Sequence, residues 1–174
     1  MNTETPRARI SLATADVAAE LLELQKLCFY TEAELNREFN IPSLKQTLDG
    51  LREEFRTNTV LAAWVGPWLV GSVRGRRDGA ICHISRFMVH PDHRGRGLGT
   101  MLLAAIEAAF PGVEYYEIFT GERSERNLRL YGSLGYVSYR REVVTPRLTL
   151  IHLRKKGSAF GFPMDLETPP KPPV

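Results

Sequence analysis

The sequence contains few cysteines and no long apolar run, and both features exclude whole classes of protein. Only two cysteines occur among 174 residues, Cys28 and Cys82, and each lies inside an apolar segment. This placement is typical of reduced core thiols rather than of a disulfide framework. No run of eighteen apolar residues is present, and residues 1–9 lack the apolar stretch of a signal peptide. The sequence therefore predicts a cytoplasmic protein that is neither secreted nor inserted in a membrane.

Charge and aromatic content argue against specific binding of nucleic acid. The formal net charge is only +3, and aromatic residues make up 9% of the chain. The arginines are scattered, and aromatic side chains are not interleaved with them as a stacking surface for bases would require. Arg nevertheless supplies most of the basic residues. Because its planar guanidinium suits phosphate oxygens, this bias favours a small polyanionic ligand.

Motifs for metals and nucleoside triphosphates are also missing. His90 and His93 flank Asp92, but these residues lie in a proline-containing loop without further ligands at metal-binding spacing. No Gly-Lys-Ser or Gly-Lys-Thr sequence of a nucleoside-triphosphate loop occurs. We therefore expect no metal cofactor.

The hydrophobic period changes along the chain, which predicts a domain that mixes helices and strands. Helical spacing of apolar residues predicts helices over residues 16–28, 43–55, 98–109 and 124–134. Asp16 is the expected N-cap of the first helix, and Ser43 with Gln46 forms a capping box for the second. Apolar and β-branched runs predict strands over residues 10–13, 60–65, 68–74, 81–90, 115–120, 136–144 and 148–153. Strands 81–90 and 115–120 flank a helix, so a right-handed crossover would make them parallel.

The composition changes after Lys156, where Gly and Pro become frequent. Because proline excludes regular hydrogen-bonded structure, we expect a domain over residues 1–156 and an extended tail over residues 157–174.

The turn over residues 94–99, Arg-Gly-Arg-Gly-Leu-Gly, has the composition of a pyrophosphate-binding loop. Its three glycines remove Cβ atoms where an anion approaches and permit positive φ. The helix that begins near Leu98 adds unpaired backbone NH groups and the positive end of its dipole. Arg94 and Arg96 would add charge-assisted hydrogen bonds. The spacing excludes a dinucleotide fingerprint, because the third glycine of that motif would stand where this chain has Thr100.

Two segments resemble the signatures of one family. Residues 89–99, Val-His-Pro-Asp-His-Arg-Gly-Arg-Gly-Leu-Gly, resemble the acyl-CoA-binding motif of the GNAT N-acetyltransferase superfamily. Residues 127–136, Asn-Leu-Arg-Leu-Tyr-Gly-Ser-Leu-Gly-Tyr, resemble the later helix of that family and its exit into the next strand. The resemblance spans residues 10–153. It implies an α/β (α+β) fold with a central mixed, mostly antiparallel sheet of about six to seven strands, helices on both faces, and a parallel strand pair flanking an acyl-CoA cleft.

The resemblance also implies how acetyl-CoA, or another acyl-CoA, would bind as co-substrate. Backbone groups of Phe87, Met88 and Val89 would hydrogen-bond the pantetheine arm as if it were an added strand. The pyrophosphate would be held by the turn residues Arg94, Gly95, Arg96, Gly97, Leu98, Gly99 and Thr100. Many relatives carry Asn where this chain has Ser124, so Ser124 and Asn127 are expected to share the contact with the CoA arm.

Two side chains match catalytic positions of the family and imply direct attack by an amine. Tyr131 corresponds to the phenol that protonates the departing thiolate, although a core aromatic would also suit this position. His83 stands where many relatives have a carboxylate as general base, and a packed strand histidine is its other interpretation. Glu117 and Glu122 are reserve candidates for the base.

The sequence does not choose the amine acceptor. In the family, the loop between the first two helices commonly lines the acceptor site, and here it carries Glu32, Glu34 and Glu38 beside Tyr30, which favours a cationic amine. A small-molecule amine and a peptide amine both remain open, as do the acyl chain and the formation of a homodimer. The alternative function is a non-catalytic acyl-CoA-binding module, which would keep the glycine turn but need neither Tyr131 nor a base.

Overall fold

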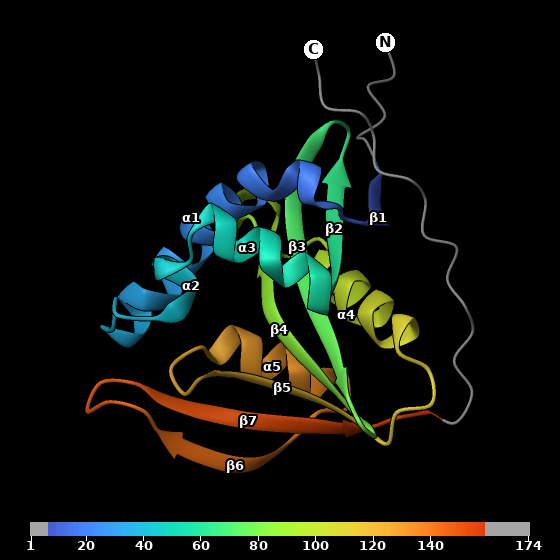
Figure 1. Cartoon of the computed structure of the whole chain (residues 1–174). Coiled ribbons are helices and arrows are strands. Elements are labelled where there is room, and N and C mark those ends of the chain that lie inside the picture. The colour runs from blue at the N-terminus through green and yellow to red at the C-terminus, as the bar shows by residue number, and fades with distance from the viewer. Residues whose placement is uncertain (1–6, 159–174) are drawn as a thin grey trace.

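One seven-stranded sheet contains every strand of the described part of the chain (Figure 1). The computed structural model describes residues 7–158, so residues 159–174 of the predicted tail lie outside it. The strands are β1 (Ala8–Leu12), β2 (Thr59–Val65), β3 (Trp68–Asp78), β4 (Ile81–Val89), β5 (Tyr115–Gly121), β6 (Val137–Val143) and β7 (Thr149–Lys156). Their order is β1-β2-β3-β4-β5-β7-β6, and only β4 and β5 are parallel. The predicted mixed, mostly antiparallel sheet with one parallel pair is confirmed.

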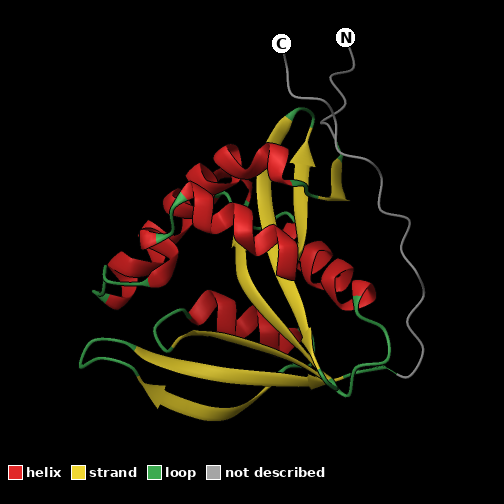
Figure 2. Cartoon of the chain, viewed as in Figure 1, coloured by secondary structure: helices red, strands yellow, loops and turns green. Residues whose placement is uncertain are grey.

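The parallel pair divides the sheet into two halves that separate from each other. Strands β4 and β5 pair only at their beginnings, where Ile81–His83 lie opposite Tyr115–Glu117. Beyond that point β4 continues beside β3, and β5 continues beside β7. Figures 1 and 2 show β1–β4 running away from β5–β7, which leaves a wedge between the facing edges of β4 and β5.

Helices cover both faces of the sheet and bury two apolar clusters (Figure 2). On one face lie α1 (Ala18–Asn36), α2 (Pro42–Lys45) and α3 (Leu48–Thr57), and on the other lie α4 (Leu98–Ala109) and α5 (Glu125–Ser133). Helix α4 and the residue that ends it pack closely on β3, since a Cβ added at Gly75 would stand 3.0 Å from Ile106 and 2.5 Å from the Phe110 ring. Two short 3-10 turns, Ala15–Val17 and Pro91–His93, complete the elements.

Most predicted elements are present, among them the β2–β3 hairpin, α4, and α5 with its positive-φ Gly135.

The prediction for the first helix was wrong at both ends. Asp16 lies inside the 3-10 turn, where its carboxylate accepts a hydrogen bond from Thr14 (3.3 Å), and Val17 takes the N-cap position of α1. The helix then continues to Asn36, so most of the segment expected to be a loop is helical.

The prediction for the second helix was also wrong, because the chain breaks between α2 and α3. Gln46 is not the end of a capping box: its side chain joins a buried polar network, accepting from Gln25 (2.9 Å) and donating to Glu54 (2.5 Å). The new helix α3 is instead capped by Thr47, whose hydroxyl accepts from the Gly50 amide (3.1 Å).

Within residues 7–158, no helix is long and apolar enough to cross a membrane.

Candidate active site

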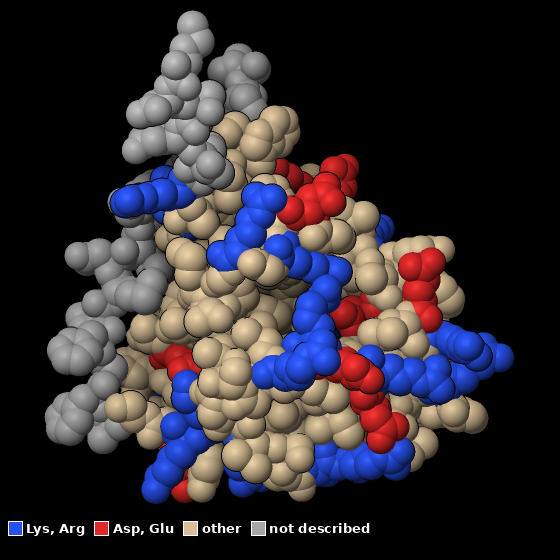
Figure 3. Space-filling model, turned by 180° about the vertical axis from the view of Figure 1, so that it is seen from behind, with Lys and Arg blue, Asp and Glu red and all other residues tan. Residues whose placement is uncertain are grey.

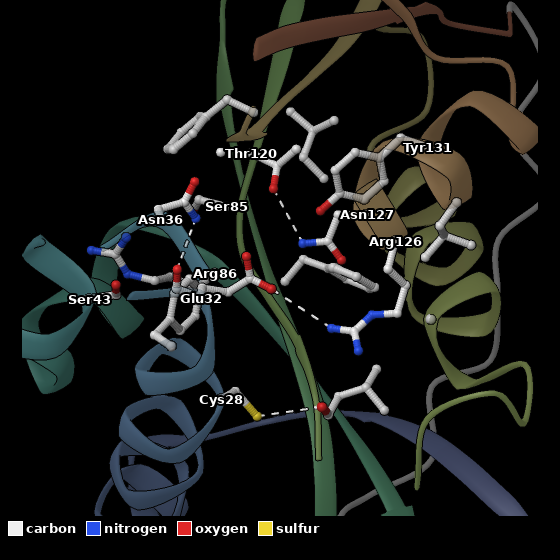
Figure 4. Close-up of a pocket in the computed structure, with 18 of the residues that line it drawn as sticks. Cys28, Glu32, Asn36, Ser43, Ser85, Arg86, Thr120, Arg126, Asn127 and Tyr131 are labelled. Carbon is white, nitrogen blue, oxygen red and sulfur yellow. Dashed lines mark hydrogen bonds and ion pairs between the residues drawn. The ribbon is translucent and has the colours of Figure 1, made fainter. Parts of the chain in front are cut away.

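A pocket of about 750 Å³ occupies the wedge between β4 and β5 (Figure 4). Its walls come from segments far apart in the sequence: α1 with the chain that follows it, β4, the glycine turn, β5, α5 and the β6–β7 hairpin. The separation of the two strands therefore creates a cavity that both halves of the sheet line.

The glycine turn forms one end of this pocket. Gly95 and Gly97 have positive φ values of 72° and 79°, and the space where a Cβ would stand is open at both. Gly97 is the N-cap of α4 and has no side chain to accept from the helix amides, so the first amide to bond back is Met101, which donates to the Gly97 carbonyl (3.0 Å). The amides of Leu98, Gly99 and Thr100, which all line the pocket, are left without an intrahelical partner. Such amides at the positive end of a helix form an anion-binding site.

Gly99 serves packing as well. A Cβ at this position would stand 3.0 Å from both Leu130 of α5 and Phe87 of β4. The absence of a side chain lets the start of α4 approach both neighbours and fixes the position of the turn.

The two arginines of the turn are placed differently. Arg94 lines the pocket, and its Nε donates to the Val89 carbonyl (3.0 Å), which also accepts a contact from the Cys28 thiol (3.5 Å). Arg96 is exposed and stands outside the pocket lining. Figure 3, which shows the face opposite to that of Figure 1, has Lys and Arg side chains running down its middle with Asp and Glu side chains beside them. The turn thus offers backbone amides to the pocket, and only one of its two guanidinium groups borders it.

Tyr131 stands deeper in the pocket, on α5. Its side chain is only 2% exposed, and its ring packs against Phe87 and Tyr136 with centroid distances of 5.8 and 6.1 Å. Burial, reinforced by the negative charge of Glu32, raises the pKa of the Tyr131 phenol well above its ordinary value. Figure 4 shows the phenol oxygen pointing into the pocket.

Glu32 of α1 faces Tyr131 from the other side of the pocket. Its carboxylate accepts a hydrogen bond from the Ser124 hydroxyl and lies 3.8 Å from the Arg126 guanidinium. Asn127 also lines this region and donates to the Thr120 hydroxyl (3.3 Å). A carboxylate, a neutral phenol and an amide therefore meet in one cavity (Figure 4).

Comparison with known proteins decides the family. The sequence model described as the Acetyltransferase (GNAT) family matches residues 18–136, which is more than half of the chain. The chain belongs to the GNAT acetyltransferase family. No curated protein matches the sequence.

Solved GNAT structures share the fold over nearly their whole length. A PaiA N-acetyltransferase from Thermoplasma acidophilum, in complex with coenzyme A, matches with a TM-score of 0.72 and 13% identity, covering 86% of this chain and 99% of its own. The ribosomal-protein-S18-alanine N-acetyltransferase from Escherichia coli matches with a TM-score of 0.71 and 14% identity over 89% and 97% of the two chains. The putative acetyltransferase yncA from Salmonella typhimurium, solved with acetyl-CoA, matches with a TM-score of 0.68 and 17% identity. The match covers 91% of this chain and 99% of that structure. At these identities the likeness concerns the fold.

Not every residue expected to bind the CoA arm borders the pocket. Phe87 and Val89 do, but the Met88 side chain is buried in the apolar cluster beneath α1 and α3. The Val89 carbonyl already accepts from Arg94 and Cys28. Ser124 is buried behind the lining and directs its hydroxyl to Glu32.

His83 does not line the pocket that Tyr131 lines. It lies where β4 and β5 are still paired, opposite Glu117, and outside the pocket lining. The imidazole is 41% exposed and stands 3.8 Å from Glu117 and 4.0 Å from Asp78. Glu117 and Glu122 also lie outside the lining, and Glu122 is held by Arg141 (2.8 Å). The pairing that places His83 at the closed end of the wedge thus separates it from the cavity.

Most of the acidic segment over residues 30–40 is helical, so its side chains point to different sides of α1. Tyr30 and Glu34 are one helical turn apart on an exposed face, and the Tyr30 ring contacts Phe39 (5.4 Å between centroids). Glu32 lines the pocket, as does Glu38 beyond the helix end. Of the acidic residues and the tyrosine expected at the acceptor site, Glu32 and Glu38 therefore line the pocket, whereas Tyr30 and Glu34 do not.

Sequence reasoning missed several polar residues of the lining, among them Asn36, Arg86, Thr120 and Arg126. Asn36 carried a signal, since Cys28, Glu32 and Asn36 follow one another at four-residue spacing and so share one face of α1. No comparable pattern marks Arg86. Among residues 7–158, no group of three potential metal ligands occurs.

Proposed function

We propose that the protein is an N-acetyltransferase that moves the acetyl group of acetyl-CoA to an amine by direct attack. One observation carries the proposal: the first residues of α4, whose amides have no intrahelical partner, line the same cavity as the buried Tyr131. Amides at a helix N-terminus suit the pyrophosphate, whereas a buried phenol suits a reaction that produces a thiolate. The chain's family and the solved relatives that hold coenzyme A or acetyl-CoA support the choice of co-substrate.

The open edge of β4 gives the pantetheine arm a place to lie. Within the part of the chain that the structure describes, this edge has no strand partner beyond His83, and Phe87 lines the pocket along it. We propose that the arm takes the place of the missing strand between the glycine turn and Tyr131. Asn127 would contact it from α5, and Ser124 would act on the site only through Glu32.

Attack requires the lone pair of the amine. A primary amine with a pKa of roughly 10 is almost entirely protonated at neutral pH, so exposing its lone pair costs about 4 kcal/mol. We assign the proton acceptor to Glu32 in place of His83, because the Glu32 carboxylate lines the cavity whereas the imidazole does not. Glu32 would hold the ammonium group as an ion pair and take its proton directly or through water.

Tyr131 completes the reaction at the sulfur. As nitrogen forms its bond to the acetyl carbon and the carbon–sulfur bond breaks, the sulfur gains negative charge. The raised pKa keeps the phenol protonated at neutral pH, so it is available to donate a hydrogen bond, and then a proton, to that sulfur. The ammonium nitrogen loses two protons in all: the first goes to Glu32 before the attack and from there to solvent, and the second, lost after the attack, replaces the proton that Tyr131 gives to the sulfur.

The test has two stages. Acetyl-CoA should stabilise the protein against heat in a saturable way, by about 2.7 kcal/mol at one hundred times its Kd. Free thiol should then be released from acetyl-CoA only when an accepted amine is present. Absence of both effects would overturn the proposal. Stabilisation without amine-dependent thiol release from any amine would instead identify a non-catalytic acyl-CoA-binding module.

A further inference from the structure

Arg86 places a positive charge on the pocket wall without a partner. It lies on β4 at an irregularity of the β3–β4 register, with a positive φ of 49°, and lines the cavity. Its Nε is buried, and within residues 7–158 its guanidinium has neither a hydrogen-bond acceptor nor a carboxylate at ion-pair distance. In Figure 4 the side chain extends from β4 toward Ser43 at the start of α2.

The carboxylate that acts on Arg86 electrostatically already has hydrogen-bond partners of its own. Glu54 acts on Arg86 through space, but one of its oxygens accepts from Arg74 and the other from Gln46 (2.5 Å). The remaining charged side chains of the lining have polar contacts of their own: Glu32 with Ser124 and Arg126, Glu38 with Thr145 (3.0 Å), Glu142 with His152 (2.6 Å), and Arg94 with the Val89 carbonyl. Among these charged side chains of the lining, Arg86 therefore differs in having no polar contact of its own within the described part of the chain.

Such an arrangement costs free energy in the absence of a ligand. Burial lowers the pKa of the Arg86 guanidinium, but an arginine remains charged in a protein, so the unpaired cation persists. The positive φ of a non-glycine residue adds a backbone cost of about 1 kcal/mol or more. A half-buried charge without a partner at a pocket wall points to a binding role, since an incoming anion would pair with it.

We propose that Arg86 binds the carboxylate of the acceptor, so that the acceptor is an amino acid: a small molecule with an amine and a carboxylate. The inference rests on the proposed acetyl transfer. The phosphates of the co-substrate are assigned to the glycine turn, which leaves Arg86 for the other substrate. A planar guanidinium matches a carboxylate with two parallel hydrogen bonds. Glu32 lines the same cavity and would receive the amine, so the two ends of an amino acid meet opposite charges.

The experiment compares acceptors in matched sets. Each set contains an amino acid, its carboxamide and the amine that remains when the carboxyl group is removed, for example phenylalanine, phenylalaninamide and phenethylamine. We expect kcat/KM of the wild-type protein to be about 10- to 100-fold higher for the amino acid than for the two other members of its set, because a hydrogen bond to a charged group is strong. Arg86→Gln should remove this preference, because kcat/KM for the amino acid should fall about 10- to 100-fold, toward the values for the two other members of its set. Arg56→Gln, at a side chain that is 77% exposed on α3, is the matched control and should keep the preference.

The comparison of acceptors with the wild-type protein tests the proposal even when the Arg86 variant fails to fold. Equal or better use of the carboxamides, or acetylation of no amino acid at all, would overturn the proposal. An Arg86→Gln variant that loses the same factor on every member of a set would overturn it as well. Acetyl-CoA-dependent thermal stabilisation is measured beside these assays, and its presence keeps the proposed function standing when the acceptor proposal fails.

Discussion

Tyr131 is the residue whose role can be tested with the smallest chemical change. Replacement by Phe removes one oxygen from a ring that packs against Phe87 and Tyr136, so the packing is kept. We expect Tyr131→Phe to lower kcat about 100-fold or more, since a positioned acid typically contributes that much, and to change the Kd for acetyl-CoA less than threefold. Steady-state kinetics with calorimetric titration measures both. Equal losses in kcat and in affinity would mean that the phenol only helps to bind the co-substrate.

Variants of Glu32 and His83 show which of the two residues is the general base. Glu32→Gln keeps the shape of the side chain but removes the proton acceptor, so kcat should fall about 100-fold or more. His83→Ala should retain activity within about threefold, because the imidazole lies outside the pocket lining. The kcat of both variants as a function of pH provides the measurement. A large loss in His83→Ala together with an active Glu32→Gln would return the role to the histidine.

The two cysteines should react slowly despite the position of Cys28 at the pocket. Burial raises the pKa of the Cys28 thiol to about 11 and that of Cys82 to about 12. A raised pKa means less thiolate at a given pH, so at pH 8 Cys28 holds roughly one hundredth of the thiolate of an ordinary cysteine. Iodoacetamide labelling followed by mass spectrometry should therefore be slow in the native protein and rise about tenfold per pH unit from pH 8 to 10. Fast labelling of the native protein at pH 8 would contradict this.

At the scale of elements, one side-chain contact joins the two loops at the acceptor end of the pocket. Glu38, just after α1, accepts from the Thr145 hydroxyl in the β6–β7 connection (3.0 Å) and from the Asn40 amide (2.9 Å). These hydrogen bonds lower the pKa of Glu38. A depressed pKa stabilises the fold above the pKa of the unfolded carboxyl, about 4.3, and the contribution disappears as pH falls through the lower folded value.

Thr145→Val removes one of these donors and keeps the shape of the side chain. Its Tm should lie below that of the wild-type protein at pH 7, and the difference should become smaller toward pH 3, as Glu38 takes up a proton. A part that does not depend on pH should remain, because the Thr145 hydroxyl also accepts from the Arg147 and Leu148 amides (3.2 and 3.0 Å). Thermal unfolding at the two pH values measures the effect. A Tm difference that is equal at both pH values would show that the contact with the carboxylate is not its cause.

The elements also show where local pattern stops being informative. The hairpin, the turn and α4 were predictable because Gly66-Pro67, the three glycines and the apolar spacing act within a few residues. The end of α2 was not, because Gln46 is drawn out of the helix by Gln25, Arg74 and Glu54, which lie 8 to 28 residues away in the sequence. The continuation of α1 was missed because its charged residues suggested a loop, although Glu32 and Asn36 keep the spacing of one face.

At the scale of the whole molecule, the site exists because the sheet opens. The sequence predicts the parallel pair and identifies two motifs, so the positions of the turn and of Tyr131 could be inferred from their residues. It does not reveal that pairing ends at His83, and that single fact decides which side chains border the cavity. His83 and Arg96 were therefore expected in a site that they do not line, whereas Arg86 and Arg126, which line it, went unnoticed.

The binding of pyrophosphate by the amides at the start of α4 is the claim on which the proposed function depends. Calorimetric titration with coenzyme A and with pantetheine, which has the same arm and thiol but lacks the nucleotide and its phosphates, tests it most directly. We predict that coenzyme A binds about 100-fold more tightly than pantetheine or better, because several charge-assisted hydrogen bonds depend on the phosphates. Equal affinity for the two compounds would contradict the claim, since it would mean that the glycine turn holds no phosphate.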